Sequence, residues 1–271
     1  MNKINGKEIA SQILIDLKKK SVPKKFLAVF LIGDDASSIS FVKQKEKIAK
    51  ELGVDFRIYR PSNSLNNDRL RECIRKIVNV KKCGGVIVQL PLPSNINANY
   101  ILNVIPSQKD VEIMSERMIG AFYDGRSKVL PPSVEVVKQV LDNLGIKKEN
   151  LKRVAIVGQG FLIGRPVTNW FLAGISEVLA LDRGSDFNLL KEADLVICGM
   201  GQAGLIKSSM LKEEAIIIDF GYGISAKTGK MAGDFEVEGV DKNIFYTSTP
   251  GGTGPILVAS LFKNFYKLNE E

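Results

Sequence analysis

The sequence predicts an α/β protein of two lobes, each built on a mainly parallel sheet. Short apolar segments alternate along the chain with amphipathic helical patterns, which is the rhythm of successive β-α-β units. Most of the apolar segments are continuous rather than alternating, as expected for parallel strands that helices cover on both faces. A stretch rich in glycine and proline at 105–132 has no long periodic element and marks the crossing between the lobes.

The individual elements follow from these patterns. Strands are expected at 26–32, 54–59, 85–90, 153–157, 177–181, 195–198, 215–220 and 243–247. Helices are expected at 5–20, 38–52, 67–79, 133–144, 164–174, 186–193 and 256–268. Several of these helices follow Ser, Asp or Asn, the residues that cap helix N-termini. We expect a first domain over 1–120, a second over 121–250, and a last helix within 251–271 that returns to the first domain.

Composition excludes several classes of protein. The 271 residues are 45% hydrophobic and 25% charged, which is typical of a globular protein. Histidine is absent, which excludes Ser-His-Asp and Cys-His nucleophiles and imidazole metal sites, so we expect no metal. Three separated cysteines, Cys73, Cys83 and Cys198, fit neither a disulfide framework nor a zinc knuckle and favour a reducing cytoplasm. No apolar run approaches the length of about 18 residues that a membrane helix needs, and the N-terminal segment is not typical of a signal peptide.

The net charge of +8 comes from 38 Lys and Arg against 30 Asp and Glu. The basic residues are dispersed, and no aromatic-rich RNA-binding motif accompanies them. A solvated, lysine-rich surface explains this charge better than nucleic-acid binding, for which steep salt-dependent retention on DNA would be required. We therefore expect no nucleic-acid partner.

A glycine-rich turn follows the expected strand at 153–157. Gly158, Gln159 and Gly160 come first, and Gly164 opens the next helical pattern. Such glycines permit a tight turn, and the free N–H groups of the following helix point at a pyrophosphate. The spacing is GxGxxxG rather than GxGxxG, so simple turn chemistry remains an alternative. In context, the pattern indicates a Rossmann-like, doubly wound second lobe.

Asp182 and Arg183 follow the next expected strand and bear on the choice of dinucleotide. A carboxylate at this place accepts hydrogen bonds from the ribose 2′-OH and repels a 2′-phosphate, which favours NAD over NADP. The adjacent arginine is able to bind that phosphate, which keeps NADP open. Both residues are also ordinary turn charges.

Polar residues in the first lobe form a second group. Lys45 lies in a predicted helix, and Gln89 ends a strand that leads into Pro91-Leu92-Pro93, at the sheet edge where ligands usually bind. Together with the turn at 158–164, these motifs resemble the methylenetetrahydrofolate dehydrogenase/cyclohydrolase family over nearly the whole chain. The resemblance rests on the helix with Lys45, QLPLP at 89–93, PxxKDV at 106–111, IGRP at 163–166, AD at 193–194, DFG at 219–221, GD at 233–234 and TPGGTGP at 249–255.

The resemblance implies an activity and a set of site residues. Such an enzyme oxidises 5,10-methylenetetrahydrofolate to the methenyl cation with NAD or NADP, hydrolyses that cation to 10-formyltetrahydrofolate, and usually forms a homodimer. Lys45 would be the catalytic lysine and Gln89 its partner, since a desolvated lysine can act as an acid or a base. The substrate-binding residues implied are Phe41, Asp110, Glu112, Pro250, Gly251 and Gly252. The cofactor-binding residues implied are Gly158, Gln159, Gly160, Ile163, Gly164, Asp182, Arg183, Gly199 and Gly221.

This chain departs from the family pattern at several of these positions. Phe41 replaces the active-site tyrosine and offers no hydroxyl, Glu112 replaces the pterin-binding aspartate, and Ile113 replaces the glycine after it. In the second lobe, Gln159 and Gly160 replace an arginine and a serine, which also favours NAD. Hydride transfer is therefore the more secure activity. The alternative is a catalytically impaired relative that binds folate or dinucleotide as a sensor or scaffold. An unrelated shikimate-type dehydrogenase would lack QLPLP and PGGxGP.

Overall fold

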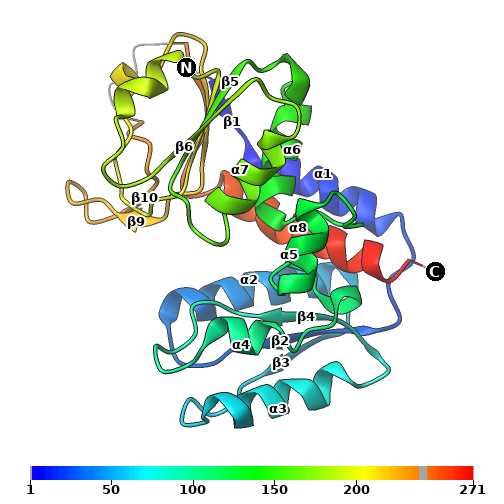
Figure 1. Ribbon diagram of the computed structural model, residues 1–271. Coiled ribbons are helices and arrows are strands. Elements are labelled where there is room, and N and C mark those ends of the chain that lie inside the picture. Colours follow the sequence, from blue (N-terminus) through cyan, green and yellow to red (C-terminus); the bar gives the residue numbers. More distant parts are fainter. Residues whose placement is uncertain (1, 238–242, 271) are drawn as a thin grey trace. The chain divides into compact units, whose positions relative to one another are not determined.

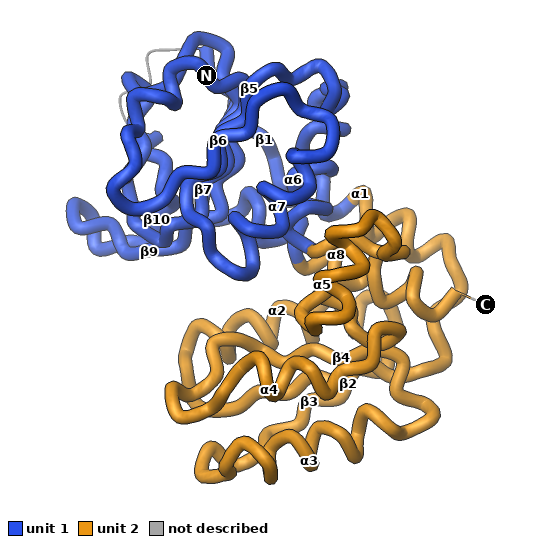
Figure 2. The backbone as a smooth tube through the Cα atoms, viewed as in Figure 1, with its two compact units in different colours: residues 1–11, 132–257 blue, residues 12–131, 258–271 orange. Residues whose placement is uncertain are grey.

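The computed structural model describes residues 2–237 and 243–270, which form two compact units. Unit 1 consists of Met1–Ser11 and Pro132–Leu257, and unit 2 consists of Gln12–Pro131 and Val258–Glu271 (Figure 2). The division after residue 131 falls eleven residues later than the expected boundary at 120, and the first eleven residues join the second half of the chain. The α/β class and the Rossmann-like parallel sheet are confirmed.

Unit 2 contains a three-stranded parallel sheet in the order β3-β2-β4 (Figure 1). The strands are β2 (Phe26–Phe30), β3 (Phe56–Tyr59) and β4 (Cys83–Val88). Every residue of β2 and β4 is buried, which explains why both read as continuous apolar runs. The helices of this unit are α2 (Ala36–Leu52), α3 (Asn67–Val78), α4 (Ala98–Leu102) and α5 (Glu116–Tyr123), with a 3₁₀ turn η1 at Ser107–Lys109.

The two faces of this sheet bury different partners. On one face, Phe26 and Phe30 pack with Leu70 and Ile74 of the amphipathic α3 and with Ile101 of α4. On the other face, α8 (Thr253–Leu268) comes so close that a Cβ at Gly85 would lie 2.7 Å from the Phe265 ring. Glycine is therefore required at position 85 for the C-terminal helix to pack on the sheet.

The C-terminal helix also orders the loops around residue 112. Asn264 is 3% exposed, and its Nδ2 donates to Val111 O at 2.9 Å and to Leu130 O at 2.7 Å. The buried side-chain amide of Asn264 thus supplies hydrogen-bond donors to two loop carbonyls that do not bond to a strand. The stretch 105–132, in which no long periodic element was expected, contains the short helix α5 of eight residues.

Unit 1 contains a six-stranded parallel sheet in the order β1-β11-β8-β7-β5-β6. The strands are β1 (Asn2–Ile4), β5 (Arg153–Val157), β6 (Glu177–Leu181), β7 (Leu195–Cys198), β8 (Ile216–Asp219) and β11 (Phe245–Thr247). The strand order reverses at β5, whose neighbours are β6 and β7. Ligands of doubly wound sheets bind beyond the carboxyl ends of the strands at such a switch point.

Helices and short turns complete unit 1. They are α6 (Pro132–Asn143), α7 (Gly164–Leu172), the first residues of α1 (Gly6–Lys18), the 3₁₀ turns η2 (Lys148–Asn150), η3 (Phe187–Glu192) and η4 (Ser208–Met210), and the antiparallel pair β9 (Gly223–Ile224) and β10 (Met231–Ala232). The segment expected as a helix at 186–193 is a 3₁₀ turn. Strand β1 was not expected, since three residues give no periodic signal.

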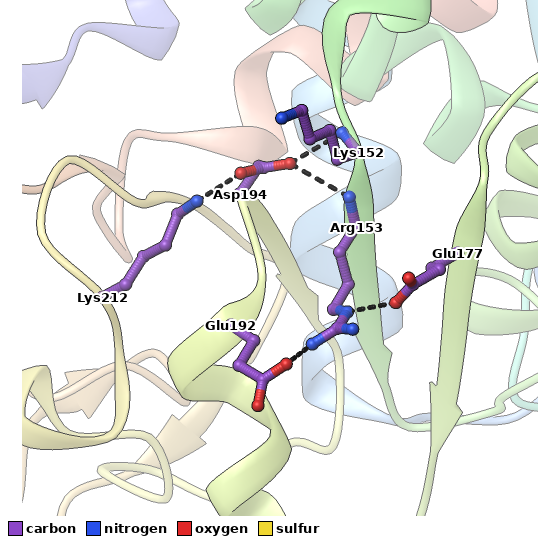
Figure 3. Close-up of polar contacts among 6 residues, drawn as sticks. All are labelled: Lys152, Arg153, Glu177, Glu192, Asp194 and Lys212. Carbon is purple, nitrogen blue, oxygen red and sulfur yellow. Dashed lines mark hydrogen bonds and ion pairs between the residues drawn. The ribbon is translucent and has the colours of Figure 1, made fainter.

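Ion pairs join the strands of unit 1 at the amino edge of its sheet (Figure 3). Asp194 Oδ2 accepts hydrogen bonds from the backbone N–H groups of Lys152 at 2.7 Å and Arg153 at 3.0 Å, and Oδ1 pairs with Lys212. Burial would raise the pKa of Asp194, but these hydrogen bonds outweigh it and hold the pKa below its ordinary value. The guanidinium of Arg153 also pairs with two glutamates, Glu177 and Glu192. This edge lies opposite the one where a ligand is expected.

Among the described residues, no helix combines the length and apolar character needed to cross a bilayer.

Candidate active site

Lys45 is held inside unit 2 by a well-capped helix. The N-cap Asp35 accepts from Ser38 N at 2.7 Å, and Gly53 ends α2 in the left-handed conformation with φ of 71°. Lys45 lies on the buried face of this helix and is 4% exposed. A buried ammonium is costly unless its protons find acceptors, so its surroundings decide what it does.

Two acceptors from distant segments meet the Lys45 ammonium. Lys45 Nζ lies 3.0 Å from Gln89 Oε1 and 3.3 Å from Glu112 Oε1. Gln89 follows β4 and is itself fixed by donating from Nε2 to Leu90 O at 2.8 Å. The ion pair with Glu112 is shielded from water, since the two side chains are 5% and 9% exposed. The structure thus brings together the two predicted catalytic residues and one predicted substrate-binding residue.

Burial also acts on the carboxylate of this pair. Desolvation raises the pKa of Glu112 above its ordinary value, the nearby Lys45 opposes that rise, and Asp110 adds to it. The carboxyl group therefore binds a proton more readily than an exposed glutamate does. A group of this kind, in an enclosed polar site, is typical of a functional centre.

The turn that carries Glu112 is fixed from both sides. Asp110 is 1% exposed, and its carboxylate accepts from Met114 N at 3.0 Å and Ser115 N at 2.7 Å. Its oxygens therefore hold the turn. Ile113 has φ of +57°, an unusual value for a β-branched residue, with a cost of about 1–3 kcal/mol. Its 5% exposed side chain is anchored in a small cluster formed with Met118, Phe122, Val129 and Leu268.

Phe41 lies one helical turn before Lys45 and is half-buried. Residues four apart on a helix share a face, so the ring and the ammonium lie on the same side of α2. The ring provides an apolar surface beside the polar group, without a hydroxyl to donate or accept a proton.

In unit 1, the glycine turn after β5 leaves no room for a side chain at Gly158 or Gly164, whereas Gly160 has open space around it. Gly158 has φ of +95°, and a Cβ there would lie 2.9 Å from Met200 Sδ and 3.0 Å from Gly199 O. A Cβ at Gly164 would overlap the carbonyl of Gly158, so the first turn of α7 packs directly on the glycine turn. Ile163 precedes that helix and provides no side-chain cap. Arg165 N donates to Gly160 O at 3.1 Å and Pro166 has no N–H, so the glycine backbone of the turn, rather than a row of free helix N–H groups, is what fits the pyrophosphate of a dinucleotide.

Asp182 and Gln159 are joined at the same turn. Asp182 Oδ2 accepts from Gln159 N at 3.2 Å, and its Oδ1 accepts from Arg183 N at 2.8 Å. The side chain of Gln159 is engaged locally, because Nε2 donates to Ile156 O and Oε1 accepts from Thr168 Oγ1. Gln159 therefore contributes its backbone to this turn, while Asp182 and Arg183 are exposed beside it.

The loops after β7 and β8 carry Gly199 and Gly221, and two buried carboxylates support them. Asp234 accepts from the N–H groups of Met200 and Gln202, and Asp219 accepts from Gly221 N. Sequence reasoning did not place these aspartates in the site. The available signal was the DFG and GD motifs, in which Asp219 stands two residues before Gly221 and Asp234 directly follows Gly233.

The aspartates and Cys198 form the one group of potential metal ligands found among the described residues. Their ligand atoms lie within 4.8 Å of one another. Burial raises the pKa of Cys198 well above 9.0, so the thiol is a neutral donor, and its Sγ lies 3.3 Å from Asp219 Oδ1. N–H and S–H donors thus face the carboxylates, which is an environment suited to anions.

The loop from Pro250 to Gly252, which the resemblance implies to bind substrate, joins β11 to α8. Gly251 has φ of +94°, and Gly252 N donates to Ser248 O at 2.7 Å. A Cβ at Gly6 would overlap the carbonyl of Gly252, so this loop packs tightly against the start of α1. Glycine is therefore required at positions 6 and 252 for this loop to pack within unit 1.

Fold and site define an α/β protein with a buried lysine centre in one unit and a doubly wound dinucleotide-type sheet in the other. The model for the catalytic domain of tetrahydrofolate dehydrogenase/cyclohydrolase matches residues 4–112, and the model for its NAD(P)-binding domain matches residues 131–271. The chain belongs to the tetrahydrofolate dehydrogenase/cyclohydrolase family, and the resemblance found in the sequence is confirmed.

Individual relatives extend over nearly the whole chain. A bifunctional protein FolD from Halothermothrix orenii is 32% identical over 279 residues, covering 97% of this chain and 96% of the relative. The crystal structure of the bifunctional FolD methylenetetrahydrofolate dehydrogenase/cyclohydrolase from Campylobacter jejuni matches with a TM-score of 0.93 and 31% identity, over 99% of this chain and 98% of that one. A 5,10-methylenetetrahydrofolate dehydrogenase from the silkworm Bombyx mori matches with a TM-score of 0.86 and 25% identity, over 99% and 98%.

Asp219 makes stability depend on pH. Burial, the largest influence, raises the pKa of Asp219 from 3.8 to about 6, backbone N–H donors oppose the rise, and Asp234 adds to it. Because the folded state binds this proton more tightly, the contribution to stability is fully present below pH 3.8 and is lost as the pH rises through about 6. The difference corresponds to about 3 kcal/mol.

We therefore expect the free energy of unfolding of the unsubstituted protein to fall, relative to that of an Asp219→Asn variant, by up to about 3 kcal/mol across this pH range. Urea denaturation at several pH values measures it. A difference between the two proteins that stays constant across the range would contradict the assignment to Asp219.

Proposed function

We propose that this chain oxidises 5,10-methylenetetrahydrofolate to 5,10-methenyltetrahydrofolate with a nicotinamide dinucleotide, and hydrolyses the methenyl compound to 10-formyltetrahydrofolate. The observation that carries the proposal is the buried Lys45, whose Nζ has Gln89 and Glu112 as acceptors at 3.0 Å and 3.3 Å. Membership of the family supports both activities.

The residues of unit 2 divide the work of binding and proton transfer. Glu112 accepts hydrogen bonds from the amide and amino groups of the pterin, and the ring of Phe41 packs on the apolar part of the substrate. The turn held by Asp110 keeps Glu112 in place. Lys45 stands beside the one-carbon bridge, where the neutral form of its amine, after the ammonium has released a proton, takes a proton from the water that adds to the methenyl carbon. Gln89 orients that amine.

In unit 1, the glycine turn and the start of α7 bind the pyrophosphate, and Asp182 binds the adenosine ribose. The bound nicotinamide supplies the hydride acceptor. In the segment Pro250 to Gly252, the exposed Pro250 and the partly exposed Gly251 leave backbone that ligand atoms can approach, whereas Gly252 is buried within its own loop.

Hydride transfer and water addition place different demands on this protein. The first needs mainly orientation of donor and acceptor, whereas the second needs a proton to leave the water. Because Phe41 offers no hydroxyl to assist that proton transfer, we propose that cyclohydrolase turnover is the slower of the two activities.

We also propose a homodimer located in the cytoplasm. The family resemblance supports the first point. The second is supported by the three cysteines of the described residues, all of which are free thiols, two of them buried.

The function is tested by mixing the protein with methylenetetrahydrofolate and NAD or NADP and following the absorbance of the methenyl product. A Lys45→Ala variant is expected to lose methenyl hydrolysis by at least about 100-fold, the usual contribution of a proton-transferring group, while dinucleotide affinity is unchanged. Lys47→Ala, on the exposed side of the same helix, is the matched control and is expected to behave as the unsubstituted protein.

Two results would contradict this assignment. Undiminished methenyl hydrolysis in Lys45→Ala would remove the lysine from its role. No methenyl product from the unsubstituted protein with either dinucleotide would contradict the dehydrogenase function itself.

We propose NAD as the preferred dinucleotide, because Asp182 stands next to the glycine turn and accepts hydrogen bonds at both oxygens. Asp182→Ala is expected to lower kcat/KM with NAD about tenfold and to reduce the preference over NADP, since one charged acceptor for the ribose is lost. Arg183→Ala, the adjacent control, is expected to lower activity with NADP only. Steady-state kinetics with both dinucleotides measures this, and equal rates in the unsubstituted protein would contradict the preference.

A further inference from the structure

Asp234 is an internal side chain that holds an exposed loop. It is fully buried, yet both of its carboxylate oxygens point at the loop that follows β7. Oδ2 accepts from Met200 N and Oδ1 accepts from Gln202 N, each at 2.6 Å. These are short hydrogen bonds to a charged acceptor, and bonds of this kind are about twice as strong as neutral ones. The loop therefore has a fixed backbone although Gly201 and Gln202 are exposed.

The loop held by Asp234 packs against the glycine turn. A Cβ at Gly158 would lie 2.9 Å from Met200 Sδ and 3.0 Å from Gly199 O, so these atoms form the surface on which the turn rests. Gly199 in turn lies against Ile163, since its Cβ would be 3.2 Å from Ile163 Cγ2. A displacement of Met200 would thus be transmitted to the turn at Gly158 and to the start of α7.

Asp219 holds Asp234 in turn. Its Oδ1 accepts from Asp234 N at 3.2 Å and from Gly221 N at 2.7 Å, and its Oδ2 accepts from Phe235 N at 2.9 Å. Position 221 is also closed sterically, because a Cβ there would overlap the Asp234 carboxylate. The carbonyl of Asp219 accepts from Thr253 Oγ1 at 2.9 Å, which connects the same group to the start of α8.

We propose that Asp219 and Asp234 are positioning residues for the dinucleotide: together they fix the loop at 199–202 and Gly221 at the carboxyl edge of the sheet before the cofactor binds. The inference rests on the proposed function, in which this edge binds a nicotinamide dinucleotide. A binding surface that is already ordered loses less conformational entropy when its ligand arrives, so the two carboxylates raise affinity without touching the ligand.

The same sheet offers a matched comparison. Asp194 also uses its carboxylate to accept two backbone N–H groups, those of Lys152 and Arg153, but at the amino edge. Replacing Asp194 or Asp234 by asparagine keeps the size of the side chain. It removes one acceptor and places an N–H donor against a backbone N–H. Both substitutions are therefore expected to lower stability. Only Asp234→Asn, at the carboxyl edge, is expected to weaken binding of the dinucleotide.

The test measures binding of NADH and of NADPH by fluorescence titration in the unsubstituted protein, Asp234→Asn and Asp194→Asn, with the melting temperature of each. We expect Asp234→Asn to raise the Kd of the better-bound dinucleotide about tenfold, the effect of losing one hydrogen bond to a charged group, and Asp194→Asn to leave it unchanged. Folate KM in the dehydrogenase assay is expected to stay the same in both variants. Equal Kd values in all three proteins would overturn the inference while leaving the proposed function intact.

Hydrogen exchange in the unsubstituted protein decides the question if Asp234→Asn does not fold. The amides of Met200 and Gln202 are expected to be protected without cofactor and to gain little protection on adding NADH. Free exchange that becomes slow only after NADH is added would show that the ligand, and not the carboxylates, orders the loop. If the unsubstituted protein binds neither dinucleotide, the proposed function fails, and the exchange experiment still reports whether the carboxylates fix the loop.

Discussion

A charged amine almost completely removed from water sets the organisation of unit 2. Lys45 is 4% exposed, and burying an unpaired ammonium would cost a large part of the net stability of a domain. Its acceptors have to come from elsewhere in the chain, namely from Gln89 after β4 and from Glu112 in the turn before α5. Three segments distant in sequence are thereby brought to one point. Removing one partner of such a buried ion pair lowers stability more than replacing both partners by apolar residues, because it leaves the other charge buried without a partner.

In unit 1, the buried charged side chains are carboxylates rather than an amine. At the carboxyl edge of its parallel sheet, two buried carboxylates collect backbone N–H donors from the loops after β7 and β8 and from the segment 234–235. The hydrogen bonds differ between the units, because Lys45 donates to side-chain oxygens, whereas the aspartates accept from backbone N–H groups. The lysine centre presents reactive groups, whereas the carboxylates of unit 1 leave glycine backbone at the surface. This division agrees with the proposed function, in which one unit acts on a folate and the other binds a dinucleotide.

Most of the regular structure could be predicted from the sequence, because long apolar runs and helical periods are local signals. The strands β2, β4, β5 and β7 are fully or almost fully buried, and their composition shows it directly. Strand β1 was missed because its three residues gain strand structure only by pairing with β11. The α-helical signal at 186–193 was misleading, since a short segment capped by Asp186 closes there as a 3₁₀ turn.

The sequence names candidate site residues but does not show their geometry. Lys45 and Glu112 came from the family resemblance, and no local pattern indicates that their side chains meet. The left-handed backbone of Ile113 is invisible in a sequence, because β-branched residues avoid that conformation and only the anchored side chain explains it. The inward side chain of Gln159 likewise depends on Thr168, which becomes its neighbour only in the folded unit.

In the proposed function, the buried pair of Lys45 and Glu112 faces the folate. The most direct measurement is a crystal structure with an unreactive analogue of methylenetetrahydrofolate. The pterin N–H groups are expected to donate to the Glu112 carboxylate, with the one-carbon bridge beside Lys45 Nζ. An analogue bound elsewhere, with the Lys45 and Glu112 pair unchanged and out of its reach, would contradict the account.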